Sequence, residues 1–208
     1  MGKIIVLAGP SAVGKTTLAD YMIKNGAPLE LVRSATTRAP RGDGHDDEYI
    51  YLSRNDFRDF CERGGMLEFT EYAGAFYGTP ASEIERIFAD GKIPLLILDI
   101  KGVLSIKSLE KYPSLAVYMF DDIEVLEKRL YDRYLGTNPT VEGLLKFQSR
   151  KERNLEEFAN IEEISRGFDM LLDNRDLEGS ARELMAAYSD GQEQDKKSCA
   201  IQKIKEMI

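Results

Sequence analysis

The chain has 208 residues, of which 43% are hydrophobic and 31% charged, a balance typical of a soluble globular protein. Its formal net charge of −8 argues against a non-specific binder of DNA or of membrane surfaces, since either would need a basic face. No apolar run approaches the roughly 20 residues that span a bilayer. Two cysteines are too few for a disulfide framework or a zinc site. We therefore expect one domain in the cytoplasm, with no leader segment and no nucleic-acid or membrane partner.

The first half of the chain predicts a buried strand, a helix and then a series of shorter strands. Residues 3–8 form a nearly continuous apolar run, typical of a strand buried on both faces, and residues 14–25 carry apolar residues at helical spacing. Ser53 is expected to cap a helix that runs to about residue 63, with Asp56 completing a capping box. Residues 35–47, rich in Gly, Pro, Asp and Arg, are expected to be loop. Further strands are expected at 29–34, 48–52, 66–72 and 75–79, the last two as a hairpin.

The second half predicts strands that alternate with helices. Strands are expected at 94–99, 115–120 and 169–172, and helices at 81–90, 103–111, 123–134, 140–159 and 177–188. This alternation predicts an α/β fold with a parallel sheet flanked by helices. The shorter strands between about 34 and 80 indicate a small inserted lobe. The polar residues 189–208 are interpreted as a tail appended to a domain of residues 1–188, ending in a short amphipathic stretch.

A glycine-rich segment follows the first strand and opens the first helix. Gly9-Pro-Ser-Ala-Val-Gly-Lys-Thr16 fits the phosphate-loop pattern G-x-x-x-x-G-K-[ST] at every fixed position. Glycines let successive backbone N–H groups turn toward a phosphate, and the helix N-terminus adds positive dipole. The segment therefore predicts a P-loop NTPase fold, with Lys15 as a catalytic cation and Thr16 as a ligand of Mg²⁺ together with ATP phosphates and waters. The residues predicted to bind ATP are Gly9, Pro10, Ser11, Ala12, Val13, Gly14, Lys15, Thr16 and Thr17.

Asp99 follows the apolar run that begins at residue 94. An acidic residue at the carboxyl end of a parallel strand lies where ligands bind in open α/β sheets. We predict a role for Asp99 beside the metal or the second substrate, with a simple strand-end cap as the alternative.

Four later segments contain recognisable motifs: Ser34-Ala-Thr-Thr-Arg-Ala-Pro-Arg-Gly42, Glu48-Tyr-Ile-Tyr-Leu-Ser53, Met66-Leu-Glu-Phe69 and Gly74-Ala-Phe-Tyr-Gly-Thr79. In order and near the expected spacing, they resemble motifs of the guanylate kinase family. The resemblance runs from residue 3 to about 187 and is strongest up to Asp99.

This resemblance implies an acceptor site for GMP in the inserted lobe. Arg38, with a catalytic role, and Arg41 would grip the phosphate through their forked donors, and Tyr49 and Tyr77 would offer hydroxyls to the same oxygens. Glu68 would accept from the N1–H and N2–H₂ donors of guanine, which adenine lacks. The residues predicted to bind GMP are Ser34, Arg38, Arg41, Tyr49, Glu68, Tyr77, Thr79 and Asp99.

The resemblance also implies a helical lid over about residues 127–155. Arg129 and Arg133 resemble the lid arginines R-L-x-x-R-G, and Arg133 is predicted to be catalytic. Arg150 resembles a further catalytic lid arginine, with Arg153 as a competing candidate. His45, the only histidine, lies in a predicted loop and indicates no histidine chemistry.

The expected reaction is transfer of the γ-phosphate of ATP to GMP or dGMP by a monomer or homodimer. Asp99-Ile-Lys-Gly102 departs from the family's D-I-D-x-Q-G, and Tyr134-Leu-Gly-Thr-Asn-Pro139 departs from its tighter turn, which leaves room for a wider deoxynucleotide range. A kinase of ribose 1,5-bisphosphate is a further alternative, although it should not need Ser34 and Glu68. A non-catalytic interaction module is disfavoured because Lys15 is present.

Overall fold

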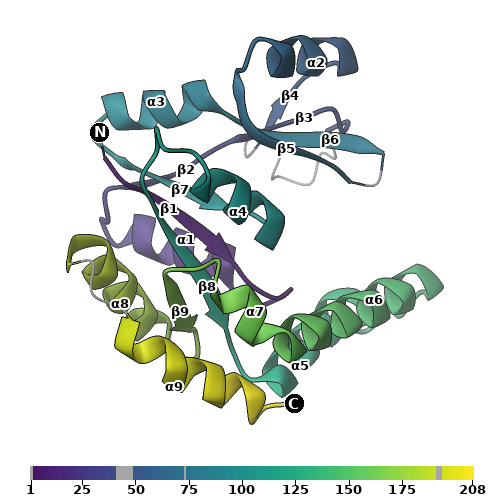
Figure 1. Cartoon of the computed structure of the whole chain (residues 1–208). Helices are drawn as coiled ribbons and strands as arrows, with labels where there is room; N and C mark the ends of the chain where they lie inside the picture. The colour runs from purple at the N-terminus through teal and green to yellow at the C-terminus, as the bar shows by residue number, and fades with distance from the viewer. Residues whose placement is uncertain (1, 41–48, 73, 191–193) are drawn as a thin grey trace. The chain divides into compact units, whose positions relative to one another are not determined.

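The computed structural model describes residues 2–40, 49–72, 74–190 and 194–208. A five-stranded sheet has the strand order β2-β7-β1-β8-β9, and its β2–β7 and β8–β9 pairs are parallel. The α/β prediction is therefore confirmed (Figure 1). The chain divides into two units, residues 1–6 with 23–114 and residues 7–22 with 115–208.

The first unit carries a second sheet, built by residues 34–80. This sheet has four strands in the order β4-β3-β6-β5, and β5 and β6 form the predicted hairpin. Helix α2 begins after Ser53, whose hydroxyl accepts from the backbone N–H of Asp56 as the capping pattern predicts. The elements of this unit are β2 (Leu29–Leu31), β3 (Ser34–Thr36), β4 (Tyr49–Tyr51), α2 (Arg54–Glu62), β5 (Met66–Tyr72), β6 (Ala75–Pro80), α3 (Ala81–Ala89), β7 (Ile93–Ile97) and α4 (Ile100–Lys107).

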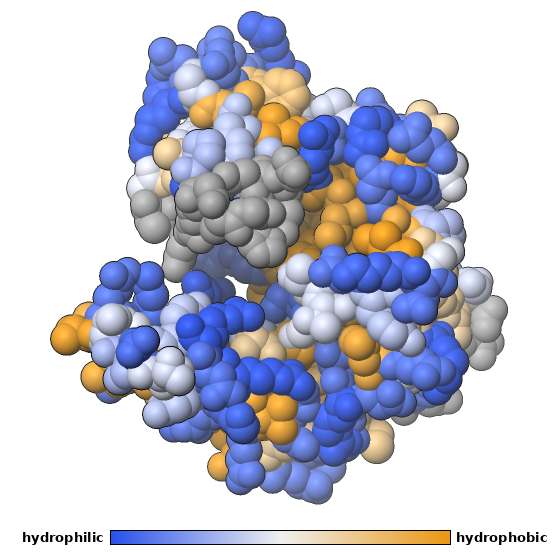
Figure 2. Space-filling model, turned by 180° about the vertical axis from the view of Figure 1, so that it is seen from behind, coloured by the Kyte–Doolittle hydropathy of each residue, from blue (hydrophilic) through white to orange (hydrophobic). Residues whose placement is uncertain are grey.

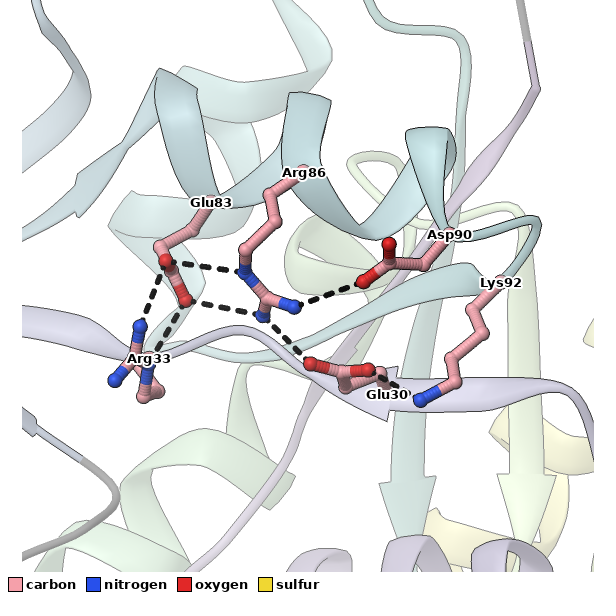
Figure 3. A network of polar contacts seen from close by, with 6 residues as sticks. All are labelled: Glu30, Arg33, Glu83, Arg86, Asp90 and Lys92. Carbon is pink, nitrogen blue, oxygen red and sulfur yellow. Dashed lines mark hydrogen bonds and ion pairs between the residues drawn. The ribbon is translucent and has the colours of Figure 1, made fainter.

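An ionic network joins the two ends of this 34–80 segment (Figure 3). Arg33, just before β3, makes a two-pronged contact with Glu83 in the first turn of α3, at 2.9 and 3.0 Å. Arg86 bridges Glu83 and Glu30, and Lys92 completes the network at Glu30. The Arg33 guanidinium holds the pKa of the buried Glu83 carboxyl below its usual value. The point where the chain leaves β2 is thereby tied to the point where it returns in α3.

The second unit contains the glycine-rich segment and most of the helices. Helices α5 and α6 lie side by side as a hairpin (Figure 1), and three apolar side chains of α6 are exposed, Val141, Leu144 and Leu145. Figure 2 shows apolar atoms scattered among hydrophilic ones on the face that it draws. No helix in the described ranges is long and apolar enough to cross a membrane. The elements are the end of β1 (Ile4–Ala8), most of α1 (Lys15–Lys24), β8 (Ser114–Phe120), α5 (Ile123–Tyr134), α6 (Val141–Ala159), α7 (Ile161–Ser165), β9 (Met170–Asp173), α8 (Leu177–Asp190) and α9 (Gln194–Lys205).

Helix α9 shows that the end of the chain is packed rather than loosely appended. Ile204 is fully buried, and α9 contacts β9, α6 and α7. Lys203 pairs with Asp173 at the end of β9, and Lys205 pairs with Glu162 of α7. The sequence predicted only a short amphipathic stretch here, because a single buried isoleucine among polar residues is a weak periodic signal.

Several predicted boundaries are wrong. The strand predicted at 29–34 is two strands in two different sheets, and β3 includes residues 35 and 36, which were predicted to be loop. Strand β7 ends at Ile97, so Asp99 does not end a strand but caps α4, which begins at residue 100 rather than 103. Helix α7 was not predicted. In each case pairing or capping in three dimensions decides where an element ends, and local composition does not report it.

Candidate functional site

The glycine-rich segment between β1 and α1 adopts backbone angles that require its glycines. Gly9 and Gly14 have φ of 142° and 98°, and Ala12 also has a positive φ of 68°. A side chain at Gly9 would place its Cβ 2.3 Å from the carbonyl oxygen of Met119, and one at Gly14 would lie 2.8 Å from the amide nitrogen of Asn174. Thr16 and Thr17 follow, exposed in the first turn of α1. The segment is therefore a loop that ends at a helix N-terminus, where backbone N–H groups favour an anion.

Lys15 lies among cations of the α5–α6 hairpin. Its ammonium donates to the carbonyl oxygens of Gly9 and Pro10, at 2.8 and 3.0 Å. The pKa of Lys15 is lowered to about 8, chiefly by burial; Glu157 opposes this shift, and the positive charges of Arg133, Arg150 and Arg153 add to it. Three arginines thus add positive charge around Lys15, and bound phosphate would relieve this repulsion.

Helix α6 contacts this loop directly. Arg150 donates from Nη1 to the hydroxyl of Ser11 at 3.4 Å, whereas Arg153 pairs with Glu157 one turn along its own helix at 3.3 Å. The side chain of Asn154 makes two hydrogen bonds to the backbone of Ser11. Of the two competing arginines, Arg150 is therefore the one that touches the loop.

Two further side chains, those of Arg129 and Asn174, donate to backbone carbonyl oxygens of the loop. The buried Asp121, directly after β8, pairs with Arg129 at 2.9 Å, and Arg129 donates to the carbonyl oxygen of Ala12 at 3.2 Å. Burial raises the pKa of Asp121, while the backbone N–H of Asp122 and then Arg129 oppose the shift. Asn174, after β9, donates to the carbonyl oxygen of Val13 at 2.8 Å. Arg129, predicted as a lid arginine, thus contacts the loop backbone.

Five of the residues predicted to bind the acceptor lie on one face of the four-stranded sheet: Ser34, Tyr49, Glu68, Tyr77 and Thr79. Ser34 pairs with Tyr49, and Glu68 pairs with Thr79. Because Ala35 pairs with Gly78 in an antiparallel ladder, Ser34 and Thr79 are also aligned. These four residues form a row across β4, β3, β6 and β5, and Tyr77 shares their face because side chains alternate along a strand.

Helix α2 covers the opposite face of this sheet. The ring of Phe57 stacks on Phe76 with centroids 5.5 Å apart and meets Phe69 edge-on at 6.3 Å. Because side chains alternate along each strand, one face of the sheet is aromatic and lies under α2, and the other face is polar and carries the row of Tyr49, Ser34, Thr79 and Glu68.

Arg38 extends this polar face beyond β3. Its guanidinium lies over the ring of Tyr49 at 5.2 Å, and the ring of Tyr49 meets that of Tyr77 at 6.3 Å. The Nη1 atom of Arg38 is buried and has no hydrogen-bond partner among the described residues. A buried guanidinium donor without a partner is costly, and an anion beside the two tyrosines would satisfy it.

Glu68 carries the carboxylate of this face. Burial raises its pKa, the hydroxyl of Thr79 opposes the shift by donating at 2.6 Å, and the nearby charge of Asp99 adds to it. Asp99 itself accepts from the backbone N–H of Gly102 at 2.8 Å, as a cap of α4. Arg41 and His45 lie outside the described residues.

The polar face therefore combines a partly desolvated carboxylate, a guanidinium and two phenols in the first unit, and the cation-rich loop belongs to the second.

The sequence matches the family model described as guanylate kinase over residues 1–190. The chain belongs to the guanylate kinase family. A guanylate kinase of Trichormus variabilis is 33% identical over 189 residues, covering 89% of each chain. One of Rubrobacter xylanophilus is 34% identical over 188 residues, covering 88% of this chain and 92% of the other.

The fold agrees with this family. The crystal structure of guanylate kinase from Anaplasma phagocytophilum matches with a TM-score of 0.64 at 22% identity, covering 92% of this chain and 86% of that one. This guanylate-kinase domain match ends at residue 190, so helix α9 lies beyond it.

Sequence reasoning missed two residues that contact the loop of this guanylate kinase family member, Asn154 and Asn174, and it also missed Asp121, which pairs with the loop-contacting Arg129. Asn154 could have been found, because it lies seven residues after Phe147 and four before Phe158 and so interrupts an apolar row of α6. Asn174 directly follows a strand, the position where ligand-site residues gather in α/β sheets. Asp121 has the same signal after β8.

Proposed function

We propose that this protein transfers the γ-phosphate of ATP to GMP or dGMP, forming ADP and GDP or dGDP. The observation that carries the proposal is the group of cations around Lys15 in a chain of the guanylate kinase family. Phosphoryl transfer requires positioning and charge neutralisation more than covalent help, and a loop whose Lys15 is surrounded by the positive charge of three arginines supplies both.

On the ATP side, the loop of residues 9–17 would hold the phosphates. Lys15 would exchange its bonds to the Gly9 and Pro10 carbonyls for phosphate oxygens, and Arg133 and Arg150 would neutralise charge that develops during transfer. The exposed hydroxyl of Thr16 is a hard oxygen donor that fits Mg²⁺, with phosphate oxygens and water completing its ligands. Bound Mg²⁺ would offset phosphate charge.

On the acceptor side, Arg38, Tyr49 and Tyr77 would bind the monophosphate, together with Arg41. Glu68 would accept from the N1–H and N2–H₂ groups of guanine, and Ser34 and Thr79 would donate to its O6 and N7 edge. Without a bound base, the single hydroxyl proton of Thr79 is donated to Glu68, and it would turn to the guanine edge when the N1–H and N2–H₂ groups bind the carboxylate. An adenine would present an acceptor to Glu68, so the half-buried carboxylate would lack the two donors that guanine supplies.

An ADP-release assay across GMP, dGMP, AMP, dTMP, CMP and ribose 1,5-bisphosphate tests the proposal. GMP or dGMP should have the highest kcat/KM, and comparison of the two measures the discrimination against deoxyribose. A preference for dTMP or for the sugar bisphosphate would refute guanine recognition. Absence of ADP release with every acceptor would refute the kinase assignment.

A further inference from the structure

Asn154 is a buried polar residue in the middle of α6, only 1% exposed. Its carboxamide makes two hydrogen bonds to one residue that is 143 positions away in sequence. The backbone N–H of Ser11 donates to Oδ1 at 2.8 Å, and Nδ2 donates to the Ser11 carbonyl oxygen at 3.1 Å. An amide that both donates to and accepts from the same residue can dock in one orientation only, so the contact fixes direction as well as distance.

The neighbours of Asn154 on the same face of α6 are the charged groups of the loop site. Arg150 precedes it by four residues and Glu157 follows by three, so all three project from one side of the helix. Arg150 contacts the Ser11 hydroxyl, and Glu157 is close enough to Lys15 to raise its pKa. The two hydrogen bonds of Asn154 therefore lie between the arginine and the carboxylate that act on the loop.

We propose that Asn154 is a positioning residue for phosphoryl transfer. Its two hydrogen bonds to the Ser11 backbone hold α6 against the phosphate loop, and they thereby fix the position of the Arg150 guanidinium relative to the bound phosphates. This inference rests on the proposed function.

A neutral side chain suits this task for an electrostatic reason. Lys15, Arg133, Arg150 and Arg153 repel one another, which favours movement of the arginine-bearing helices away from the loop. A carboxylate in place of Asn154 would hold α6 by pairing with these cations, but it would then compete with phosphate for them. The amide holds the helix and leaves the cations available to the substrate.

The test compares Asn154→Ala and Asn154→Asp with the matched control Asn160→Ala. Asn160 lies at the end of the same helix, where its amide bonds only to the carbonyl of Glu156 at 2.8 Å among the described contacts. We expect kcat to fall about 10- to 100-fold in both Asn154 variants, because small misplacement of a catalytic group has this effect. The KM for GMP should stay within about twofold, since the acceptor residues are untouched. Asn160→Ala should keep wild-type kinetics.

A double-mutant cycle separates positioning from general damage. In an Arg150→Met background, Asn154→Ala should lower kcat by no more than about twofold, because the arginine that it positions is absent. The thermal unfolding midpoint of each variant is measured by circular dichroism, and all kinetic assays are run well below it. If Asn154→Ala is too unstable to assay, the isosteric Asn154→Asp takes its place in the cycle. A kcat within about twofold of wild type in both Asn154 variants, or full additivity with Arg150→Met, would overturn the proposal.

Titration calorimetry with a non-hydrolysable ATP analogue distinguishes this inference from the proposed function. If the wild type binds the analogue but phosphorylates no GMP, the acceptor assignment fails. The role of Asn154 is then tested by binding of the ATP analogue alone. We expect the affinity of Asn154→Ala for the analogue to be about tenfold weaker, equivalent to about 1.4 kcal/mol. Unchanged affinity in that case would refute the positioning role.

Discussion

Binding of ATP should draw a proton onto Lys15. The pKa of Lys15 is lowered to about 8 by burial and by the surrounding arginines, so about half of the molecules carry a neutral amine at pH 8. Phosphate oxygens beside the ammonium would return the pKa toward its ordinary value of 10.5. The expected uptake is therefore about 0.1 proton at pH 7, about 0.5 at pH 8 and about 0.9 at pH 9.

Calorimetric titration with a non-hydrolysable ATP analogue, in buffers of different ionisation enthalpy, measures this uptake. Lys15→Met is the control, because it removes the titrating amine and keeps much of the side-chain volume. Uptake in the wild type that stays constant from pH 7 to 9, or that persists in Lys15→Met, would refute the assignment of the low pKa to Lys15.

The same shift has a consequence for stability, with a definite sign. The folded state disfavours the protonated lysine, so the unfolded chain binds more protons between pH 8 and 10.5, and wild-type stability rises with pH across that window. At pH 7 the full penalty applies, and Lys15→Met should be more stable by up to about 3 kcal/mol while losing phosphate transfer. The difference between the two proteins, measured by urea unfolding, should shrink above pH 8. A Lys15→Met variant that is less stable at pH 7 would contradict this reasoning.

Three further changes test other parts of the structure. Glu68→Gln should lower kcat/KM for GMP by a factor equivalent to about 1.5–3 kcal/mol of transition-state stabilisation, and should lower kcat/KM for AMP much less. Equal losses for the two acceptors in the ADP-release assay would show that Glu68 has a structural role and does not read the base. Glu83→Gln should lower the free energy of unfolding by about 1–3 kcal/mol in urea, because Arg33 and Arg86 lose their shared buried partner. Glu85→Gln, which alters the exposed pair with Lys111, is its control and should change the midpoint little. Ile204→Ala should lower the free energy of unfolding by about 2–4 kcal/mol if α9 is part of the folded unit. An unchanged thermal midpoint would show that α9 contributes nothing to the stability of the protein.

Local sequence patterns were sufficient to predict the glycine-dependent loop of residues 9–16 and most element types. The loop pattern works because glycine angles and a helix N-terminus are needed within a few consecutive residues, and Gly9 and Gly14 have the positive φ that the pattern requires. Helix α6 was predicted nearly to the residue, since Thr140 caps its start. Short elements were predicted less well, because three-residue strands such as β2 and β3 have too few positions to show a period.

Tertiary structure decided which distant residues act together. The row of Tyr49, Ser34, Thr79 and Glu68 depends on the register of four strands, and a slip of one residue would turn a side chain to the aromatic face under α2. The hydrogen bonds between Asn154 and Ser11 join residues that are 143 positions apart in the sequence, and no local spacing pattern predicts such a contact. Asp99 was predicted from a strand that in fact ends at Ile97, and its place as the cap of α4 follows from where that helix begins. Sequence by itself determined the geometry of the loop of residues 9–16, because that geometry is built from adjacent backbone groups, whereas the surrounding side chains take their places only when helices and sheets pack.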